Sequence, residues 1–181
     1  MKINVVGTTA SGKSTFGRKL AKTINAPFVE MDTIFWGPNW REPSDTEFFK
    51  DLEEALSSST WVLDGNYTRT THIKWREIDT VIWLDYKFPR TICQSLFRAI
   101  KRAYSKTELW PNTGNYETFG KMFSRDSIVW WCIKNYSKNR EKYKGIMSNS
   151  KYSHIQFIHL RSPEEAEEYI QSFTSSDTEK I

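Results

Sequence analysis

The stretch that decides the fold reads Ile3-Asn4-Val5-Val6-Gly7-Thr8-Thr9-Ala10-Ser11-Gly12-Lys13-Ser14-Thr15. A short apolar run leads into a loop with two glycines, and an amphipathic segment follows. Glycines let the backbone turn so that its N–H groups converge on phosphate oxygens, while Lys13 reaches the outer phosphates and Ser14 offers a hydroxyl to Mg²⁺. The stretch predicts a strand, a phosphate-binding loop and a helix, with Mg·ATP bound by Gly7, Thr8, Thr9, Ala10, Ser11, Gly12, Lys13, Ser14 and Thr15.

Length and composition predict one domain of ordinary size. The 181 residues suffice for a five-stranded sheet with helices on both faces. No apolar run approaches the roughly 18 residues of a membrane span, and a strand begins at the N-terminus without an apolar leader. We therefore expect a cytoplasmic protein with no membrane partner. Cys93 and Cys132 show no metal-ligand spacing and are expected to be reduced core residues.

Positive charge is concentrated in the middle of the chain. Residues 87–151 hold 14 Lys and Arg against 4 Asp and Glu, whereas residues 1–86 hold 10 against 12 and residues 152–181 hold 2 against 6. A basic block of this size attracts polyanions, which means either a nucleoside triphosphate with a phosphorylated acceptor or a nucleic-acid backbone. The alternative interpretation is a solvated helix surface.

Strand-like and helical patterns alternate along the chain. The strand-like runs cover residues 2–6, 27–30, 60–63, 80–84 and 154–159. Such alternation predicts an α/β fold with a five-stranded parallel sheet flanked by helices. Ser44 and Ser162 each precede a glutamate by three residues, which marks the start of a helix. We expect one domain over residues 1–173 and a flexible tail over residues 174–181.

A long segment without a strand signal separates the fourth and fifth strands. It begins as a helix around residues 91–98, is interrupted by a polar turn at residues 109–115, and continues as a second helix at about residues 116–147. Two basic helices joined by a turn are typical of lids that close over phosphates in phosphoryl-transfer enzymes. The sequence therefore predicts a helical lid inserted at about residues 88–150.

Two aspartates follow predicted strands beside the phosphate loop. Asp64 ends the run that begins at Trp61, and Asp32 follows the strand that ends at Glu30. A carboxylate in such a place can hold Mg²⁺ through water or orient an acceptor group. We predict that Asp64 and Ser14 form the metal site and that Asp32 and Asp64 are catalytic, without a choice between them as the base. The alternative for each aspartate is a cap on a turn.

Several arginines are candidates for phosphate binding. Arg98 and Arg102 lie one helical turn apart, so both project from one face and can clamp the charge that develops on a transferred phosphoryl group. We predict that they are catalytic together with Lys13. The alternative is a set of surface arginines that touch no ligand. The predicted contacts to the acceptor come from Asp32, Trp36, Asn66, Arg69, Arg125 and Arg140.

The remaining candidates are residues that could contact the base of a nucleotide. Trp36 lies in an aromatic segment after Asp32, where an indole ring can stack on a base or wall off water; ordinary packing is the alternative. Arg161 and Ser162 follow the last strand and are predicted, with Arg98, to contact the donor base.

Taken together, these motifs resemble the adenylate-kinase-like P-loop proteins that are often labelled DNA topology modulation or flagellar-regulation proteins. The likeness rests on residues 7–15, Asp32 with residues 35–40, residues 61–67 and residues 79–85, and it extends to about Phe173. That group is similar to adenylate and shikimate kinases. The resemblance implies a P-loop NTPase fold of the nucleoside monophosphate kinase type, with ATP and Mg²⁺ as cofactors.

Individual positions carry the likeness to adenylate kinase further. Leu63-Asp64-Gly65 looks like its Asp-Gly, and Arg98 and Arg102 match its arginine pair at the lid, the first of which lies against the donor adenine. The chain departs from that enzyme where Arg69 comes one residue later and where no Thr-Gly-Asp-Met pattern follows Asp32. AMP is therefore not singled out as the acceptor.

Two functions are consistent with these residues. The first is a small-molecule kinase that transfers the γ-phosphoryl of Mg·ATP to a nucleoside monophosphate or a similar small acceptor. The second is a nucleotide-dependent regulatory protein, an ATPase associated with DNA topology, that binds nucleic acid through its basic segment. We favour the kinase.

Overall fold

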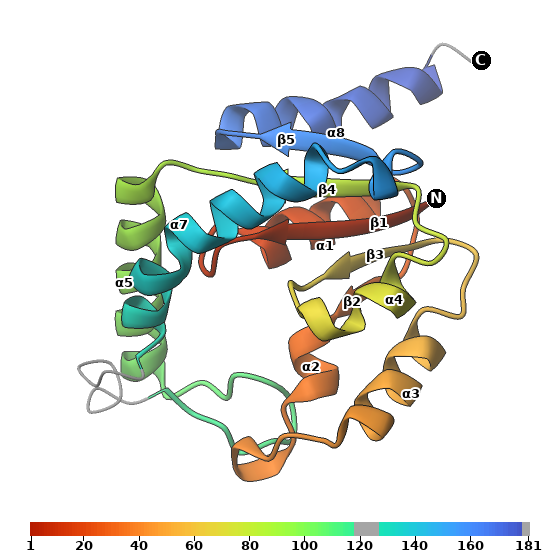
Figure 1. Ribbon diagram of the computed structural model, residues 1–181. Coiled ribbons are helices and arrows are strands. Elements are labelled where there is room, and N and C mark those ends of the chain that lie inside the picture. The colour runs from red at the N-terminus through yellow and green to blue at the C-terminus, as the bar shows by residue number, and fades with distance from the viewer. Residues whose placement is uncertain (118–126, 179–181) are drawn as a thin grey trace.

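The computed structural model describes residues 1–117 and 127–178 (Figure 1). Its strands are β1 (Lys2–Gly7), β2 (Phe28–Glu30), β3 (Trp61–Asp64), β4 (Thr80–Leu84) and β5 (Gln156–Leu160). Its helices are α1 (Lys13–Thr23), α2 (Met31–Phe35), α3 (Asp45–Ala55), α4 (Thr71–Lys74), α5 (Phe88–Ser105), α7 (Ile128–Met147) and α8 (Pro163–Thr178). Three short 3₁₀ turns are described as well, η1 (Pro38–Trp40), η2 (Thr68–Thr70) and η3 (Ser150–Tyr152).

The five described strands form one parallel sheet in the order β2-β3-β1-β4-β5, which confirms the predicted α/β architecture. Strand β1 is central: Val5 pairs with Asp64 on β3 and with Ile82 on β4. Because all strands run the same way, their carboxyl ends meet at one edge of the sheet. The loop after β1 therefore lies between the residues that follow β3 and β4.

Helices cover both faces of the sheet, and alternating strand residues fill the two cores. Val5 and Ile82 point to one face, where they meet residues of α1 and α8. Val6 and Trp83 point to the other face, which is covered by α3 and α7 among other elements. Strands buried on both faces need apolar side chains at nearly every position, which explains their continuous apolar runs.

The predicted helix starts are confirmed. Ser44 forms a reciprocal capping box with Glu47 at the start of α3. Ser162 Oγ accepts a hydrogen bond from the N–H of Glu165 at the start of α8, whose carboxylate reaches back to the N–H of Arg161. Helix α8 continues to Thr178, beyond residue 173, where the sequence predicted the domain to end and a flexible tail to begin. No proline or glycine occurs between these two residues, and nothing in the sequence stops the helix there.

The long segment between β4 and β5 contains two helices that pack against each other, α5 and α7 (Figure 1). Helix α7 ends at Met147 as predicted but begins only at Ile128, after the N-cap Ser127. Tyr116, the predicted start of this helix, instead forms an antiparallel bridge with Glu108. Of the two cysteines, Cys132 is buried as expected, whereas Cys93 on α5 is exposed.

An aromatic cluster joins α3 to the end of α2 and to the turn after β3, and it gives a direct test of the core. Phe48 is 0 % exposed, and its ring lies 5.1 Å from that of Phe35 and 5.3 Å from that of Tyr67. We expect Phe48→Ala to lower the free energy of unfolding by about 3–5 kcal/mol, because it removes apolar burial and leaves a cavity. Phe97→Ala is the matched control, since that side chain is 78 % exposed and should change stability by less than about 0.5 kcal/mol. Urea unfolding measures both, and equal losses would contradict this packing.

Candidate functional site

The loop between β1 and α1, residues 7–14, is named the glycine loop. Its first glycine, Gly7, has φ +149°, and a Cβ there would lie 2.5 Å from the carbonyl oxygen of Leu84 and 2.9 Å from Ser11 Oγ. Its second glycine, Gly12, has φ +88° and caps α1. The backbone needs glycine at both positions, at Gly7 for conformation and space and at Gly12 for conformation alone.

Asn66 clamps the start of the glycine loop. Its Oδ1 accepts a hydrogen bond from the N–H of Gly7 at 3.1 Å, and its Nδ2 donates to the carbonyl of the same residue at 2.5 Å. The hydroxyl of Tyr143 on α7 also donates to Asn66 Oδ1, at 3.1 Å. The amide is thus engaged by the protein on both sides, and the predicted contact between Asn66 and an acceptor stays a prediction. Its role in this structure is to position the loop.

Three predicted residues of the donor site come together. Ser14 Oγ donates a hydrogen bond to Asp64 Oδ2 at 2.5 Å, which joins the first turn of α1 to the end of β3. Lys13 Nζ donates to the carbonyl of Thr8 at 3.0 Å and so lies folded over the glycine loop. Burial lowers the pKa of Lys13, against the opposing charge of Asp64, and burial raises the pKa of Asp64 although Lys13 lies near. The loss of water therefore outweighs the attraction of the pair.

Asp32 and Arg98 complete this cluster of charges. Asp32 Oδ1 accepts a hydrogen bond from the hydroxyl of Tyr67 at 2.7 Å. Arg98 reaches the cluster from α5, and burial, with the neighbouring Arg102, lowers the pKa of its guanidinium. The charge of Arg98 lowers the pKa of Lys13, and the charge of Asp32 raises it. Side chains from β3, α1, α5 and the start of α2 thus converge at the carboxyl edge of the sheet.

Several buried polar atoms of this cluster have no hydrogen-bond partner among the described residues. They are Ser11 Oγ, Asp64 Oδ1 and Arg98 Nε. The first N–H groups of α1 likewise have no acceptor within the helix. Buried polar groups in native proteins are normally satisfied, so a set of unpaired donors with one unpaired carboxylate oxygen is the expected pattern around a site for an anion and a cation.

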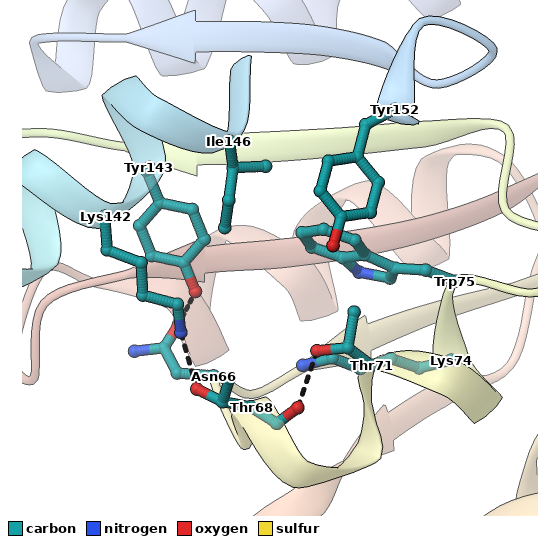
Figure 2. A pocket seen from close by; sticks show the side chains of 9 residues that line it. All are labelled: Asn66, Thr68, Thr71, Lys74, Trp75, Lys142, Tyr143, Ile146 and Tyr152. Carbon is teal, nitrogen blue, oxygen red and sulfur yellow. Dashed lines mark hydrogen bonds between the residues drawn. The ribbon is translucent and has the colours of Figure 1, made fainter. Parts of the chain in front are cut away.

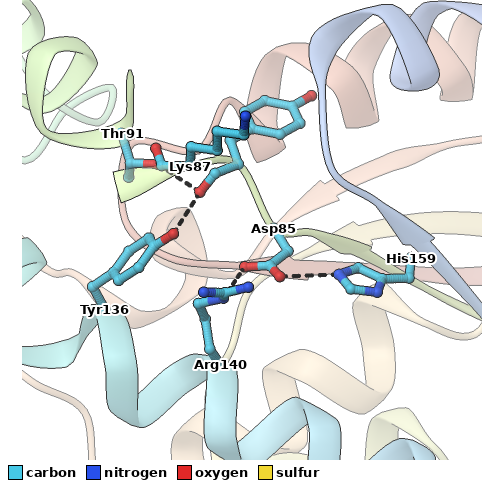
Figure 3. Close-up of polar contacts among 7 residues, drawn as sticks. Asp85, Lys87, Thr91, Tyr136, Arg140 and His159 are labelled. Carbon is cyan, nitrogen blue, oxygen red and sulfur yellow. Dashed lines mark hydrogen bonds and ion pairs between the residues drawn. The ribbon is translucent and has the colours of Figure 1, made fainter. Parts of the chain in front are cut away.

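The other predicted arginines are placed differently. Arg102 lies 3.9 Å from Glu117. Burial raises the pKa of Glu117, whereas the positive charges of Arg102 and Arg98 lower it. Both arginines therefore face Glu117 from one side of the helix, as predicted. Arg140 Nε lies 2.8 Å from Asp85 Oδ1, and Asp85 Oδ2 lies 3.0 Å from His159 Nε2 (Figure 3). In this structure Arg140 is thus paired with Asp85, and its predicted contact with an acceptor stays a prediction. Arg125 lies outside the described residues.

The predicted acceptor side is lined by aromatic rings. Trp36 stacks on Trp110, with ring centroids 5.9 Å apart and planes at 21°, and meets Trp40 edge to face at 5.6 Å. Its ring thus packs against other aromatic rings, the alternative that the sequence left open, and the predicted contact with the acceptor stays a prediction. Arg69 lies over the rings of Phe35 and Phe48 and pairs with Asp45 at 2.8 Å. Arg69 also lies close enough to Tyr67 for its charge to lower the pKa of that hydroxyl.

The predicted contacts to the donor base lie beyond β5. Ser162 caps α8, as described above. Arg161 borders an open hollow of about 340 Å³ together with Trp83, His159 and the end of α7. No residue of the glycine loop lines this hollow. The predicted contacts of Arg161 and Ser162 with the donor base therefore stay predictions.

Two residues of the site were not predicted. Tyr67 holds Asp32, and burial together with the charge of Asp32 raises the pKa of its hydroxyl, which keeps it a hydrogen-bond donor. Its place directly after Asn66 was the only available signal. Cys132 Sγ lies 3.4 Å from the carbonyl oxygen of Thr9 and covers the glycine loop from α7. No local pattern could reveal a contact across so long a stretch of sequence.

Comparisons with known proteins add no identification, since no protein-family model matches the chain and no curated protein is similar to it. In the described part of the chain, no group of three or more His, Cys, Asp and Glu side chains is placed to hold a metal ion. None of the helices in the same part is long and apolar enough to cross a membrane.

The two glycines of the loop provide a matched test of its geometry. We expect Gly12→Ala to lower the free energy of unfolding by about 1–2 kcal/mol, the cost of a left-handed conformation for alanine. Gly7→Ala should cost about 1–3 kcal/mol more, because its methyl group would also collide with the backbone of β4. Urea unfolding followed by circular dichroism measures both, and an equal loss for the two variants would contradict the close approach at Gly7.

Proposed function

We propose that the chain is a kinase that transfers the γ-phosphoryl group of Mg·ATP to a nucleoside monophosphate or a similar small acceptor. The observation that carries this proposal is a set of buried atoms around the glycine loop that have no hydrogen-bond partner within residues 1–117 and 127–178, namely Ser11 Oγ, Asp64 Oδ1 and Arg98 Nε, beside the folded Lys13. The parallel sheet, the loop after its central strand and the helix that follows are compatible with a P-loop fold. In this proposal the segment between β4 and β5 is the lid.

The residues present fit a triphosphate with its metal ion. Backbone N–H groups of the loop and of the first turn of α1 would bind phosphate oxygens, and Lys13 would release the carbonyl of Thr8 to bind them as well. Mg²⁺ is usually held by one or two protein oxygens together with waters and phosphate, so the pair of Ser14 and Asp64 is a sufficient protein contribution. A metal ion there would neutralise charge on the transferred group.

The protein groups then account for the remaining requirements of the transfer. Arg98 is half-buried beside Lys13, where its guanidinium would stabilise the charge that spreads over the phosphoryl oxygens. Asp32, fixed by Tyr67, would orient the acceptor atom for in-line attack. As the new bond from the acceptor oxygen to the γ-phosphorus forms, the bond to the β-phosphate oxygen breaks, and any proton on the attacking oxygen passes to Asp32 or to water.

A regulatory ATPase that binds DNA through its basic segment remains the competing proposal. The positive charge of residues 87–151 favours it. Binding to a nucleic-acid backbone weakens steeply between about 50 and 200 mM salt, whereas turnover of a small acceptor in a closed site depends on salt far less. Retention on DNA at low salt therefore separates the two functions.

ATP turnover tests the kinase directly. Purified protein with Mg²⁺ is assayed for ADP release against nucleoside monophosphates, deoxynucleotides, nucleosides and small hydroxy acids, with a control that lacks an acceptor. We expect release that depends on one class of acceptor, because positioning of the acceptor is the main catalytic contribution. Slow release that is the same with every acceptor, together with salt-sensitive retention on DNA, would contradict the kinase and favour the regulatory protein.

The role of Arg98 can be tested against a second arginine of the same helix. We expect Arg98→Ala to lower kcat by about 10²–10³-fold, the usual effect of removing one group that stabilises transition-state charge. Arg90→Ala is the control, since Arg90 is exposed on α5 and should leave kcat unchanged. Steady-state kinetics at saturating ATP measures both variants. A normal kcat for Arg98→Ala would exclude this residue from the transfer.

A further inference from the structure

A separate cavity lies between the turn after β3 and the end of α7. Its volume is about 150 Å³, and Figure 2 shows side chains from η2, α4, α7 and η3 around it. Trp75 and Tyr152 form an aromatic wall, with their rings 5.3 Å apart and edge to face. Neither the glycine loop nor Asp32 lines the cavity. It is therefore distinct from the proposed donor site.

Two lysines face this cavity, and its lining includes no carboxylate from the described residues. Lys74 is 2 % exposed, and its Nζ donates one hydrogen bond, to the carbonyl of Gly65 at 3.2 Å. Lys142 is half-buried, and its Nζ donates to Thr68 Oγ1 at 2.6 Å. Figure 2 shows both amines among the residues of the wall. An ammonium group has three donors, so each lysine keeps donors that no described residue uses.

The surroundings of Lys74 are unfavourable for an unpaired charge. Burial, with the neighbouring charge of Lys142, lowers the pKa of Lys74 to about 7, and only Asp64 acts in the opposite direction. The other titratable groups of the wall are the hydroxyls of Tyr143 and Tyr152. Burial also lowers the pKa of Lys142. Two cations held together without an anion are costly, and an anion between them would remove the cost.

We propose that this cavity binds a small oxyanion, held by the ammonium groups of Lys74 and Lys142 and by the hydroxyl of Thr68. The hydroxyl of Thr68 accepts from Lys142, which leaves its own hydrogen free to donate. A volume of about 150 Å³ leaves room for an inorganic oxyanion or for the phosphate of a small ester.

The cavity adjoins the clamp on the glycine loop. Asn66 lines it, and the hydroxyl of Tyr143, which also lines it, donates to the same Asn66 oxygen that accepts from Gly7. Lys74 holds the carbonyl of Gly65, the residue before Asn66. An anion that orders Lys74 and Tyr143 would therefore act on residues that fix the start of the glycine loop.

Calorimetric titration with sulfate tests the site, because sulfate keeps its charge over the working pH range. The Lys13→Met variant serves as the background, so that sulfate binding at the glycine loop is weakened, and the Lys74 and Lys142 variants show which of the remaining binding belongs to the cavity. We expect this variant to bind sulfate saturably, and Lys74→Met or Lys142→Met in the same background to weaken binding at least about tenfold, the effect of one charge-assisted hydrogen bond. Lys138→Met, exposed on α7, is the control and should leave the affinity unchanged.

Dependence on pH supplies a second readout. Lys74 is charged below its pKa of about 7 and neutral above it, so sulfate affinity should fall as the pH rises through this value. The fall should move to higher pH in Lys142→Met, because a repelling charge is gone. If Lys74→Met does not fold, Lys142→Met and the pH profile still test whether the cavity binds sulfate. Titration with a small phosphomonoester, compared with sulfate, separates an esterified ligand from a free one.

The proposal is overturned if sulfate does not bind the Lys13→Met background, or if Lys74→Met and Lys142→Met bind it as tightly as that background does. Equal loss of affinity in Lys138→Met would also overturn it, since that result would show a general effect of surface charge. Every titration is made in the Lys13→Met background. The result for the cavity therefore does not depend on whether the proposed kinase function is correct.

Discussion

The close approach of Gly7 to strand β4 is the constraint on which the site depends. With Leu84 O only 2.5 Å from where a Cβ would lie, the chain can turn there only as glycine, and the turn sends residues 8–12 over the carboxyl edge of the sheet. Asn66 fixes the same point from β3 through both backbone groups of Gly7. The position of the glycine loop is thus set jointly by the two strands that flank β1.

Charges gathered around this loop do not compensate one another fully. Asp64 is buried and Lys13 is half-buried beside it, yet burial dominates the pKa of each, in the direction that disfavours its charged form. Arg98 adds a further cation whose pKa is lowered by burial. A buried pair that only stabilised the fold would have its hydrogen bonds completed, whereas Asp64 Oδ1 and Arg98 Nε have no partner in the described part of the chain. This imbalance is what a phosphate group with its metal ion would correct.

The sheet and the glycine loop could be predicted from the sequence because both follow from local patterns. Apolar runs give the strands within two residues of their observed ends, and the glycines, Lys13 and Ser14 are adjacent in sequence. The partner of a long side chain could not be predicted this way. Arg140 meets Asp85 because α7 crosses the end of β4, and Trp36 meets Trp110 because two distant loops pack together. Lys74 resembles an ordinary surface lysine in the sequence, and only the fold buries it.

Direct titration of ATP into the wild-type protein and into Lys13→Met, each with and without Mg²⁺, tests the central claim that the glycine loop binds a triphosphate. We predict measurable binding by the wild type that is tighter with Mg²⁺, and at least about a tenfold loss of affinity in Lys13→Met, since that lysine supplies a charge-assisted hydrogen bond to phosphate. Lys138→Met, exposed on α7, should bind as the wild type does. Equal affinity of wild type and Lys13→Met, or no binding by either, would contradict the claim.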